Sequence, residues 1–170
     1  MVPVISFIGR HNSGKTTVLS GAIKYLTDAG YKVAVIKHAH RHLNIDVHKD
    51  SEMFLQAGAE YVCASSPELV LTYQHREEEA DIYSLLKEVP EGLDLVIVEG
   101  YKNEALPKIE VLRGAIDSKP MLMPQTLALV SDFPLQAEVS VFSSQAVEDI
   151  ALFILASLNI EASFKSASCH

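Results

Sequence analysis

The sequence has few cysteines and no long apolar run, and both absences narrow the class of protein. Its two cysteines, Cys63 and Cys169, make no disulfide framework, so a reducing compartment is the simplest expectation. No segment approaches the ~20 apolar residues that cross a membrane. Residues 1–4 lead into a strand pattern and lack the basic and apolar regions of a signal peptide. We therefore expect a cytoplasmic protein without a membrane partner.

Basic residues are also scarce. The chain has 14 lysines and arginines against 22 acidic residues, a formal net charge of −8. Nucleic-acid binding needs a basic surface, so this balance argues against nucleic acid as the main partner. The sequence has no internal repeat and no low-complexity segment. With 170 residues and 48% hydrophobic content, we predict one domain over residues 1–160 and a C-terminal tail over residues 161–170.

A complete phosphate-loop pattern stands near the start of the chain. Residues 9–16 read G-x-x-x-x-G-K-T. An apolar strand pattern precedes them at residues 4–8, and apolar residues at helical spacing follow them from Leu19 to Leu26. Because the motif lies between a strand and a helix, it predicts a nucleotide-binding domain with the P-loop NTPase fold.

Each residue type in this loop has a chemical reason. A phosphate approaches backbone N–H groups closely only where no Cβ blocks it, which explains the two glycines. Lys15 would reach the β- and γ-phosphates, and the Thr16 hydroxyl would bind Mg²⁺. The helix start adds free N–H groups and a partial positive charge. The predicted nucleotide-binding residues of the loop are Gly9, His11, Asn12, Ser13, Gly14, Lys15, Thr16 and Thr17.

The other apolar segments predict an α/β three-layer sandwich with a mostly parallel central sheet and an antiparallel edge region. A helix is expected over residues 77–87, and Ser144 is expected to cap the last helix. The strand over residues 107–113 alternates polar and apolar residues, so we expect it to be less buried. The other predicted strands are residues 32–37, 61–65, 69–73, 93–99, 126–132 and 138–142.

Glu99 ends an apolar strand and is followed by Gly100. An acidic residue in this position of a nucleotide-binding sheet holds Mg²⁺ or its water. Asp94, at the other end of the same strand, lies about 16 Å away at ~3.3 Å per residue and does not fit this role. We therefore predict that Glu99 belongs to the metal region.

A polar stretch with four histidines covers residues 38–51 and follows the second predicted strand. Ligands of open α/β sheets bind at such strand ends. His38, His40 and His42 alternate, so in an extended segment they share one face and could bind Zn²⁺ or Ni²⁺. A metal-delivery GTPase is therefore one alternative function.

A small-molecule kinase of the same fold is a second alternative. Such kinases bring several arginines to the transferred phosphoryl group, because its charge must be stabilised. This chain has four arginines, which are Arg10, Arg41, Arg76 and Arg113.

Guanine preference does not follow from motif spacing, because the sequence has no Asn-Lys-x-Asp stretch. Asp132 ends a late strand and could accept the N1–H and N2–H groups of guanine. Asp132 could equally be a turn residue beside Pro134.

Three stretches together resemble the molybdopterin-guanine dinucleotide biosynthesis adaptor protein B family. The first is residues 9–17, a loop that many families share. The second runs from Lys37-His38-Ala39-His40 through Asp46 to Lys49-Asp50-Ser51 and Ala57-Gly58-Ala59. The third is residues 94–102 followed by Pro107-Lys108-Ile109-Glu110-Val111. The second and third are the more specific, and the likeness covers most of residues 1–160.

The resemblance implies a dimeric protein that binds GTP with Mg²⁺, hydrolyses it weakly and assists the guanylyltransferase that joins GMP to molybdopterin. Molybdopterin and molybdoenzymes are further candidate partners. It assigns the phosphates and Mg²⁺ to Gly14, Lys15 and Thr16, the metal region to Glu99, and the side facing the phosphates to Asp46, Lys49 and Asp50. Two departures are His48, where the family tends to have glycine, and Arg41, which separates histidines that are neighbours in the family.

We expect at most a slow GTPase that acts as an adaptor. Lys15 and Mg²⁺ would offset charge on the leaving phosphate, and Glu99 or Asp46 would position metal-bound water. The sequence has no obvious arginine finger or orienting glutamine, which are worth ~10³–10⁵ in rate where they occur. The catalytic candidates are therefore Lys15, Glu99 and Asp46, and a partner would supply what is missing.

Overall fold

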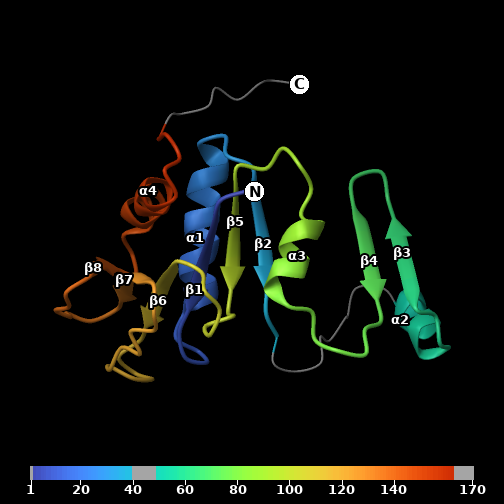
Figure 1. Ribbon diagram of the computed structural model, residues 1–170, viewed down its shortest axis with the longest axis horizontal. Helices are drawn as coiled ribbons and strands as arrows, with labels where there is room; N and C mark the ends of the chain where they lie inside the picture. Colours follow the sequence, from blue (N-terminus) through green and yellow to red (C-terminus); the bar gives the residue numbers. More distant parts are fainter. Residues whose placement is uncertain (1, 40–48, 163–170) are drawn as a thin grey trace. The chain divides into compact units, whose positions relative to one another are not determined.

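The computed structural model describes residues 2–39 and 49–162 (Figure 1). The chain divides into two compact units. The first unit comprises Met1–His38 and Glu88–His170, and the second comprises Ala39–Lys87. The single domain predicted over residues 1–160 stays a prediction.

The first unit contains a six-stranded sheet in the order β2-β5-β1-β6-β7-β8, in which every neighbouring pair is parallel. β1 lies between β5 and β6, so the chain leaves β1 toward one side of the sheet and later returns to build the other. The carboxyl end of such a central strand is where open α/β sheets bind ligands. The elements are β1 (Val4–Ile8), α1 (Lys15–Asp28), β2 (Val33–Lys37), β5 (Leu95–Glu99), β6 (Lys108–Leu112), β7 (Thr126–Ser131), β8 (Ser140–Ser143) and α4 (Val147–Ser157).

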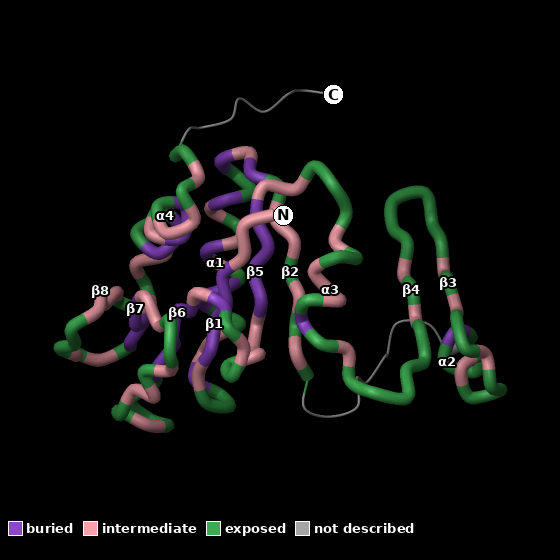
Figure 2. Tube along the Cα trace, viewed as in Figure 1, coloured by how far each residue is buried: buried purple, intermediate pink, exposed green. Residues whose placement is uncertain are grey.

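The core lies between one face of this sheet and the helices α1 and α4. Alternate strand residues face the helices, as the two-residue period of a strand requires. The central strands and the inner sides of both helices are buried (Figure 2). Tyr25 of α1 donates a hydrogen bond from its hydroxyl to Glu148 at the start of α4, over 3.0 Å. The cluster includes Ile5, Phe7, Leu19, Leu26, Ile97, Ile109, Val130, Ile150 and Ile154.

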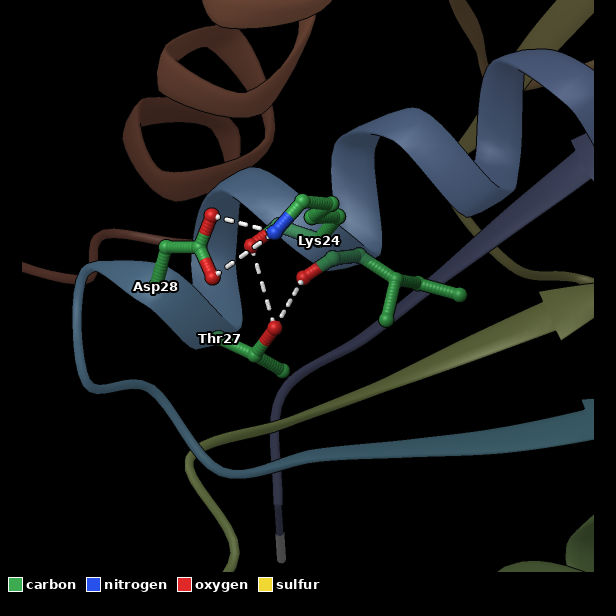
Figure 3. Close-up of polar contacts among 4 residues, drawn as sticks. Lys24, Thr27 and Asp28 are labelled. Carbon is green, nitrogen blue, oxygen red and sulfur yellow. Dashed lines mark hydrogen bonds and ion pairs between the residues drawn. The ribbon is translucent and has the colours of Figure 1, made fainter.

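The last turn of α1 carries an exposed set of local polar contacts (Figure 3). The Lys24 ammonium lies 2.9 Å from a carboxylate oxygen of Asp28, four residues later. The Thr27 hydroxyl donates to the carbonyl oxygens of Ile23 and Lys24, each over 3.0 Å. These contacts involve no residue of the predicted nucleotide site, so Lys24 is a suitable control position on the same helix as Lys15.

β6 is fully buried, so the expectation that residues 107–113 form a less buried strand is wrong. Its polar residues Lys108 and Glu110 are 1% and 2% exposed. They make hydrogen bonds to backbone groups of the two irregular segments that join β6 to β5 and to β7. Side chains with such partners can be buried, which sequence alternation alone does not reveal.

The second unit contains α2 (Lys49–Gln56), the antiparallel pair β3 (Tyr61–Ser65) and β4 (Val70–Gln74), and most of α3 (Ile82–Glu88). α3 begins later than the predicted residue 77. Asp81 explains this start, because its carboxylate accepts hydrogen bonds from the N–H groups of Tyr83 and Ser84. The side chain thus satisfies amides that a longer helix would have to pair internally.

The predicted fold class is confirmed: a parallel central sheet with helices, together with a small antiparallel pair. The predicted cap of the last helix is wrong, because the N-cap of α4 is Ala146 and no side chain caps it. Among the described residues, no helix is long and apolar enough to cross a membrane.

Candidate functional site

The loop between β1 and α1 depends on residues with positive φ. Gly9 has φ +150°, Asn12 +61° and Gly14 +86°. A Cβ on Gly9 would lie 2.4 Å from the carbonyl oxygen of Val111, so glycine lets the loop pack directly against β6. A Cβ on Gly14 would meet no atom within 4 Å. Gly14 therefore serves the left-handed conformation at the N-cap of α1, and the space beside it is open for a ligand.

Lys15 folds back onto its own loop. Its Nζ donates to the carbonyl oxygen of Gly9 over 3.1 Å and to that of Arg10 over 2.7 Å. Burial lowers the pKa of the Lys15 ammonium, the Glu99 carboxylate opposes this shift, and Lys37 adds to it. Among the described residues, the hydrogen-bond partners of the Lys15 ammonium are thus neutral carbonyls, and a phosphate oxygen would be a stronger partner.

Glu99 lies at the carboxyl end of β5, paired in register with Phe7 of β1 and Lys37 of β2. Its side chain is 12% exposed, and its carboxylate lies 3.2 Å from the Lys37 ammonium. Glu99 also acts electrostatically on Lys15. The ends of β2 and β5 therefore place Lys37 and Glu99 where both act electrostatically on Lys15 at the start of α1. Sequence reasoning had selected Glu99 and Lys15 but gave Lys37 no role.

The other residues of the loop differ in their surroundings. His11, Asn12, Thr16 and Thr17 are exposed, and Ser13 is buried. The Ser13 hydroxyl has no hydrogen-bond partner among the described residues. Arg10 forms an ion pair with Asp117, whose carboxylate oxygen lies 2.6 Å from Nε. Asp117 comes from the segment between β6 and β7, and nothing in its local sequence indicated this contact.

Two residues that follow β2 and β5 form a stacked pair. The rings of His38 and Tyr101 lie 4.5 Å apart with an interplanar angle of 22°. Tyr101 has φ +50°, and a Cβ on the preceding Gly100 would lie 2.8 Å from the Cβ of His38. His38 is thereby packed against the segment that follows Glu99. The resemblance to a family flagged both stretches, but it indicated no contact between them.

The remaining predicted residues of this region lie either outside the described residues or in the second unit. Asp46, His40 and His42 lie outside the described residues, so their predicted roles stay predictions. Lys49 begins α2 and Asp50 follows it, both in the second unit. Within residues 2–39 and 49–162, no group of three or more histidine, cysteine or acidic side chains could hold a metal ion.

Asp132 lies after β7, and one of its carboxylate oxygens accepts a hydrogen bond from the N–H group of Gly114 over 2.7 Å. This contact ties the end of β7 to the start of the segment between β6 and β7. It accounts for one oxygen of Asp132 and leaves the predicted contact with guanine as a prediction.

Comparison with known proteins gives a consistent result. The model of the family described as molybdopterin guanine dinucleotide synthesis protein B (MobB) matches residues 4–132. The chain is 32% identical to the molybdopterin-guanine dinucleotide biosynthesis adapter protein of Escherichia coli K12, over 91% of this chain and 93% of that protein. The Haemophilus influenzae protein of the same name is 30% identical, over 90% and 88%.

A solved structure of molybdopterin-guanine biosynthesis protein B (MobB) superposes with a TM-score of 0.73 at 29% identity. The match covers 91% of this chain and 99% of that chain. The similarity therefore extends over both units of the chain and not only over the phosphate loop, which many families share.

Proposed function

Since the chain belongs to the molybdopterin guanine dinucleotide synthesis protein B family, we propose that it is a GTP-binding adapter protein of molybdopterin guanine dinucleotide biosynthesis. In this role it assists the guanylyltransferase that joins GMP to molybdopterin. The observation that carries the nucleotide part of the proposal is Lys15, an ammonium held among the carbonyls of a glycine-rich loop at the end of the central strand.

The proposed phosphate site follows from this loop. A triphosphate tail would accept hydrogen bonds from the loop amides and from the first amides of α1, which have no partners within the helix. Lys15 would exchange its two carbonyl partners for phosphate oxygens. Because Gly14 has open space where a Cβ would be, a phosphate can approach the start of α1 closely.

The residues beside the loop fit Mg²⁺, which prefers oxygen ligands and retains water. Thr16 supplies an exposed hydroxyl on the first turn of α1, and Glu99 supplies a carboxylate. The Lys37 ammonium lies 3.2 Å from that carboxylate, so the Glu99 carboxylate already has a cation beside it. A bound Mg²⁺ would contribute positive charge next to the β- and γ-phosphates. Thr16 and Glu99 would orient it, and Lys37 would release or share Glu99.

Hydrolysis is proposed to be slow. Arg10, the arginine of the phosphate loop, is paired with Asp117 and does not point a free guanidinium at a phosphate. Glu99, and Asp46 from outside the described residues, are the proposed water-positioning groups. A partner that inserts an arginine would add the missing charge stabilisation, worth ~10³–10⁵ in rate where such a finger occurs.

The guanine contact is proposed for Asp132. Its carboxylate has one oxygen bonded to Gly114, and the other would accept from the base. An Asp132→Asn variant is expected to weaken GTP binding while ATP binding stays the same. Equal GTP-over-ATP discrimination in the variant and the wild-type protein would remove this assignment.

We also propose a homodimer that uses the antiparallel pair of the second unit. Two strands alone are marginally stable in water, and this pair exposes Tyr61 and Val70, which are 58% and 60% exposed. Met53 and Phe54 of α2 are similarly exposed. A Val70→Lys variant should shift the mass measured by light scattering from dimer to monomer. A wild-type monomer at all concentrations would refute the proposal.

The decisive test is calorimetric titration of GTP and ATP, with and without Mg²⁺. Lys15→Ala should abolish binding while the circular-dichroism spectrum and unfolding midpoint stay close to those of the wild-type protein. Lys24→Ala is the matched control, because it removes an exposed lysine from the same helix. Wild-type protein that binds neither nucleotide would overturn the nucleotide role.

The same samples test the adapter role. A molybdopterin-loaded guanylyltransferase should bind the wild-type protein more tightly when GTP and Mg²⁺ are present, and Lys15→Ala should lose this gain. Nickel titration of the nucleotide-free protein addresses the metal-delivery alternative, and a phosphate-transfer screen addresses the kinase alternative. Stoichiometric nickel binding, or acceptor turnover well above GTP hydrolysis, would favour the corresponding alternative.

A further inference from the structure

Lys108 is a buried cation that serves neither the phosphate loop nor Glu99 directly. It opens β6 and is 1% exposed. Its Nζ donates to the carbonyl oxygens of Glu104 over 2.6 Å, Leu106 over 2.8 Å and Pro124 over 3.1 Å. An ammonium has three donors, and here each is used by a backbone carbonyl.

Two of these carbonyls belong to the segment over residues 100–107, which crosses from β5 to β6 without a helix or strand (Figure 1). Ser6 of β1 anchors both ends of it. The Ser6 hydroxyl donates to the carbonyl of Gly100 over 2.7 Å, and the Ser6 N–H donates to that of Pro107 over 2.8 Å. Lys108 holds the part between these anchors. The segment begins directly after Glu99.

Burying an ammonium has a large desolvation cost, and burial lowers the pKa of Lys108. An apolar side chain of similar volume would avoid this cost, so stability alone does not account for a lysine at this position. What an apolar side chain lacks is donors. Residues 100–107 contain no helix or strand, and the Lys108 ammonium adds three donors to the few backbone bonds that this segment makes, which imposes a single path on it and on Pro124.

Glu110 of the same strand holds the segment between β6 and β7 by accepting hydrogen bonds, whereas Lys108 donates them. Its carboxylate accepts from the N–H groups of Met121 over 2.8 Å and Leu122 over 3.0 Å. That segment also carries Asp117, the partner of Arg10 in the phosphate loop. The two buried charges of β6 therefore shape two irregular segments, one that follows Glu99 and one that contacts the phosphate loop through Asp117.

We infer that Lys108 is a positioning residue of the proposed nucleotide site: its ammonium holds residues 100–107 in one shape and so holds Glu99 where the magnesium of the nucleotide binds. The inference rests on the proposed function. It deepens that function, because it assigns a role in metal-dependent nucleotide binding to the Pro107–Val111 stretch, which had none.

The test is the gain in GTP affinity that Mg²⁺ produces, measured by calorimetry in EDTA and in saturating Mg²⁺. Lys108→Met keeps an apolar stem of similar length and removes the donors. GTP affinity in EDTA should stay near the wild-type value, because the phosphate loop and Lys15 are unchanged. The gain from Mg²⁺ should fall about tenfold or more, the usual effect of removing a group that orients a metal ligand.

Two further variants make the result decisive. Ile109→Val removes one buried methylene from the next residue of β6, has no polar contact to lose, and should keep the full gain from Mg²⁺. Ser6→Ala removes the bond to Gly100 and should reduce the gain in the same direction as Lys108→Met. If Lys108→Met does not fold, Ser6→Ala tests the inference in its place.

The outcomes separate the two proposals. A folded Lys108→Met protein, or failing that Ser6→Ala, with the wild-type gain from Mg²⁺ overturns the positioning role and leaves the nucleotide site intact. A parallel loss of affinity in EDTA and in Mg²⁺ shows a merely structural role and also overturns it. Wild-type protein without magnesium-dependent nucleotide binding overturns the proposed function and this inference with it.

Discussion

Replacing Gly9 by alanine should be the most destabilising glycine substitution in the phosphate loop. The added Cβ would lie 2.4 Å from the Val111 carbonyl oxygen and 2.7 Å from the Ser13 hydroxyl. Atoms of these types normally stay more than 3 Å apart, and the Val111 oxygen is backbone inside a buried strand, so it cannot rotate away. Relief would require β1 and β6 to separate locally.

The loss in free energy of unfolding expected for Gly9→Ala has two parts. Overpacking of a dense interior costs about 1–3 kcal/mol. A side chain at φ +150°, a region that glycine alone adopts readily, costs about 1–3 kcal/mol more. We therefore expect Gly9→Ala to lower the free energy of unfolding by about 4 kcal/mol. Urea unfolding followed by circular dichroism measures this loss as a shift of the midpoint.

Gly92 and Gly14 supply matched controls. Both have positive φ, +83° and +86°, and neither has an atom within 4 Å of the position of an added Cβ. Alanine at either site should cost only the backbone strain, about 1–2 kcal/mol. Gly14→Ala should nevertheless lose GTP binding, because the new methyl would stand where the phosphate approaches.

Suppose that Gly9→Ala and Gly92→Ala lower the free energy of unfolding by amounts that differ by less than about 0.5 kcal/mol, the margin to which independent site effects agree. That result would refute this reasoning. It would mean that the contact between the phosphate loop and β6 is not tight. Retained GTP affinity in Gly14→Ala would separately argue against a phosphate at the start of α1.

Three further predictions concern single side chains. Ser13→Ala removes a buried hydroxyl that has no partner among the described residues, so it should stabilise the fold by about 1 kcal/mol in urea; a loss of stability would contradict this. Arg10→Ala breaks an ion pair with Asp117 whose side chains are 51% and 29% exposed, so it should cost at most about 1 kcal/mol, and less at high salt; a loss that salt leaves unchanged would count against the pair. The lowered pKa of Lys108 means that the unfolded chain binds its proton more tightly, so stability should rise with pH between the lowered pKa and ~10.4. Lys108→Met should remove this part of the rise, and identical pH profiles for the two proteins would refute the assignment.

The strand, loop and helix that frame the candidate site were predictable because they are local. The phosphate loop needs a strand, a turn with glycines at two positions and a helix that begins with Lys15, and all of these are contiguous in the chain. Glu99 was predictable because a run of apolar residues that ends in an acid places that acid at a strand end. In both cases the pattern that led to the prediction lies within a few consecutive residues, although Lys37, the partner of Glu99, is 62 residues away.

The partners of charged side chains were not predictable in the same way. Lys108 and Glu110 alternate with apolar residues in a strand that was expected to be less buried, yet both are buried. Two of their partners, Pro124 and Met121, are more than ten residues away in segments without periodicity. Asp117 and Arg10 meet across more than a hundred residues. No spacing rule connects such positions.

The sequence by itself determined the framework of the proposed phosphate site, because a nest of amides and one lysine are set by consecutive residues and their backbone preferences. Only the tertiary structure decided what holds that nest in place. A buried charge is tolerated where folded segments bring it complementary dipoles, and those dipoles meet Lys108 and Glu110 only after β1, β5 and β6 lie side by side.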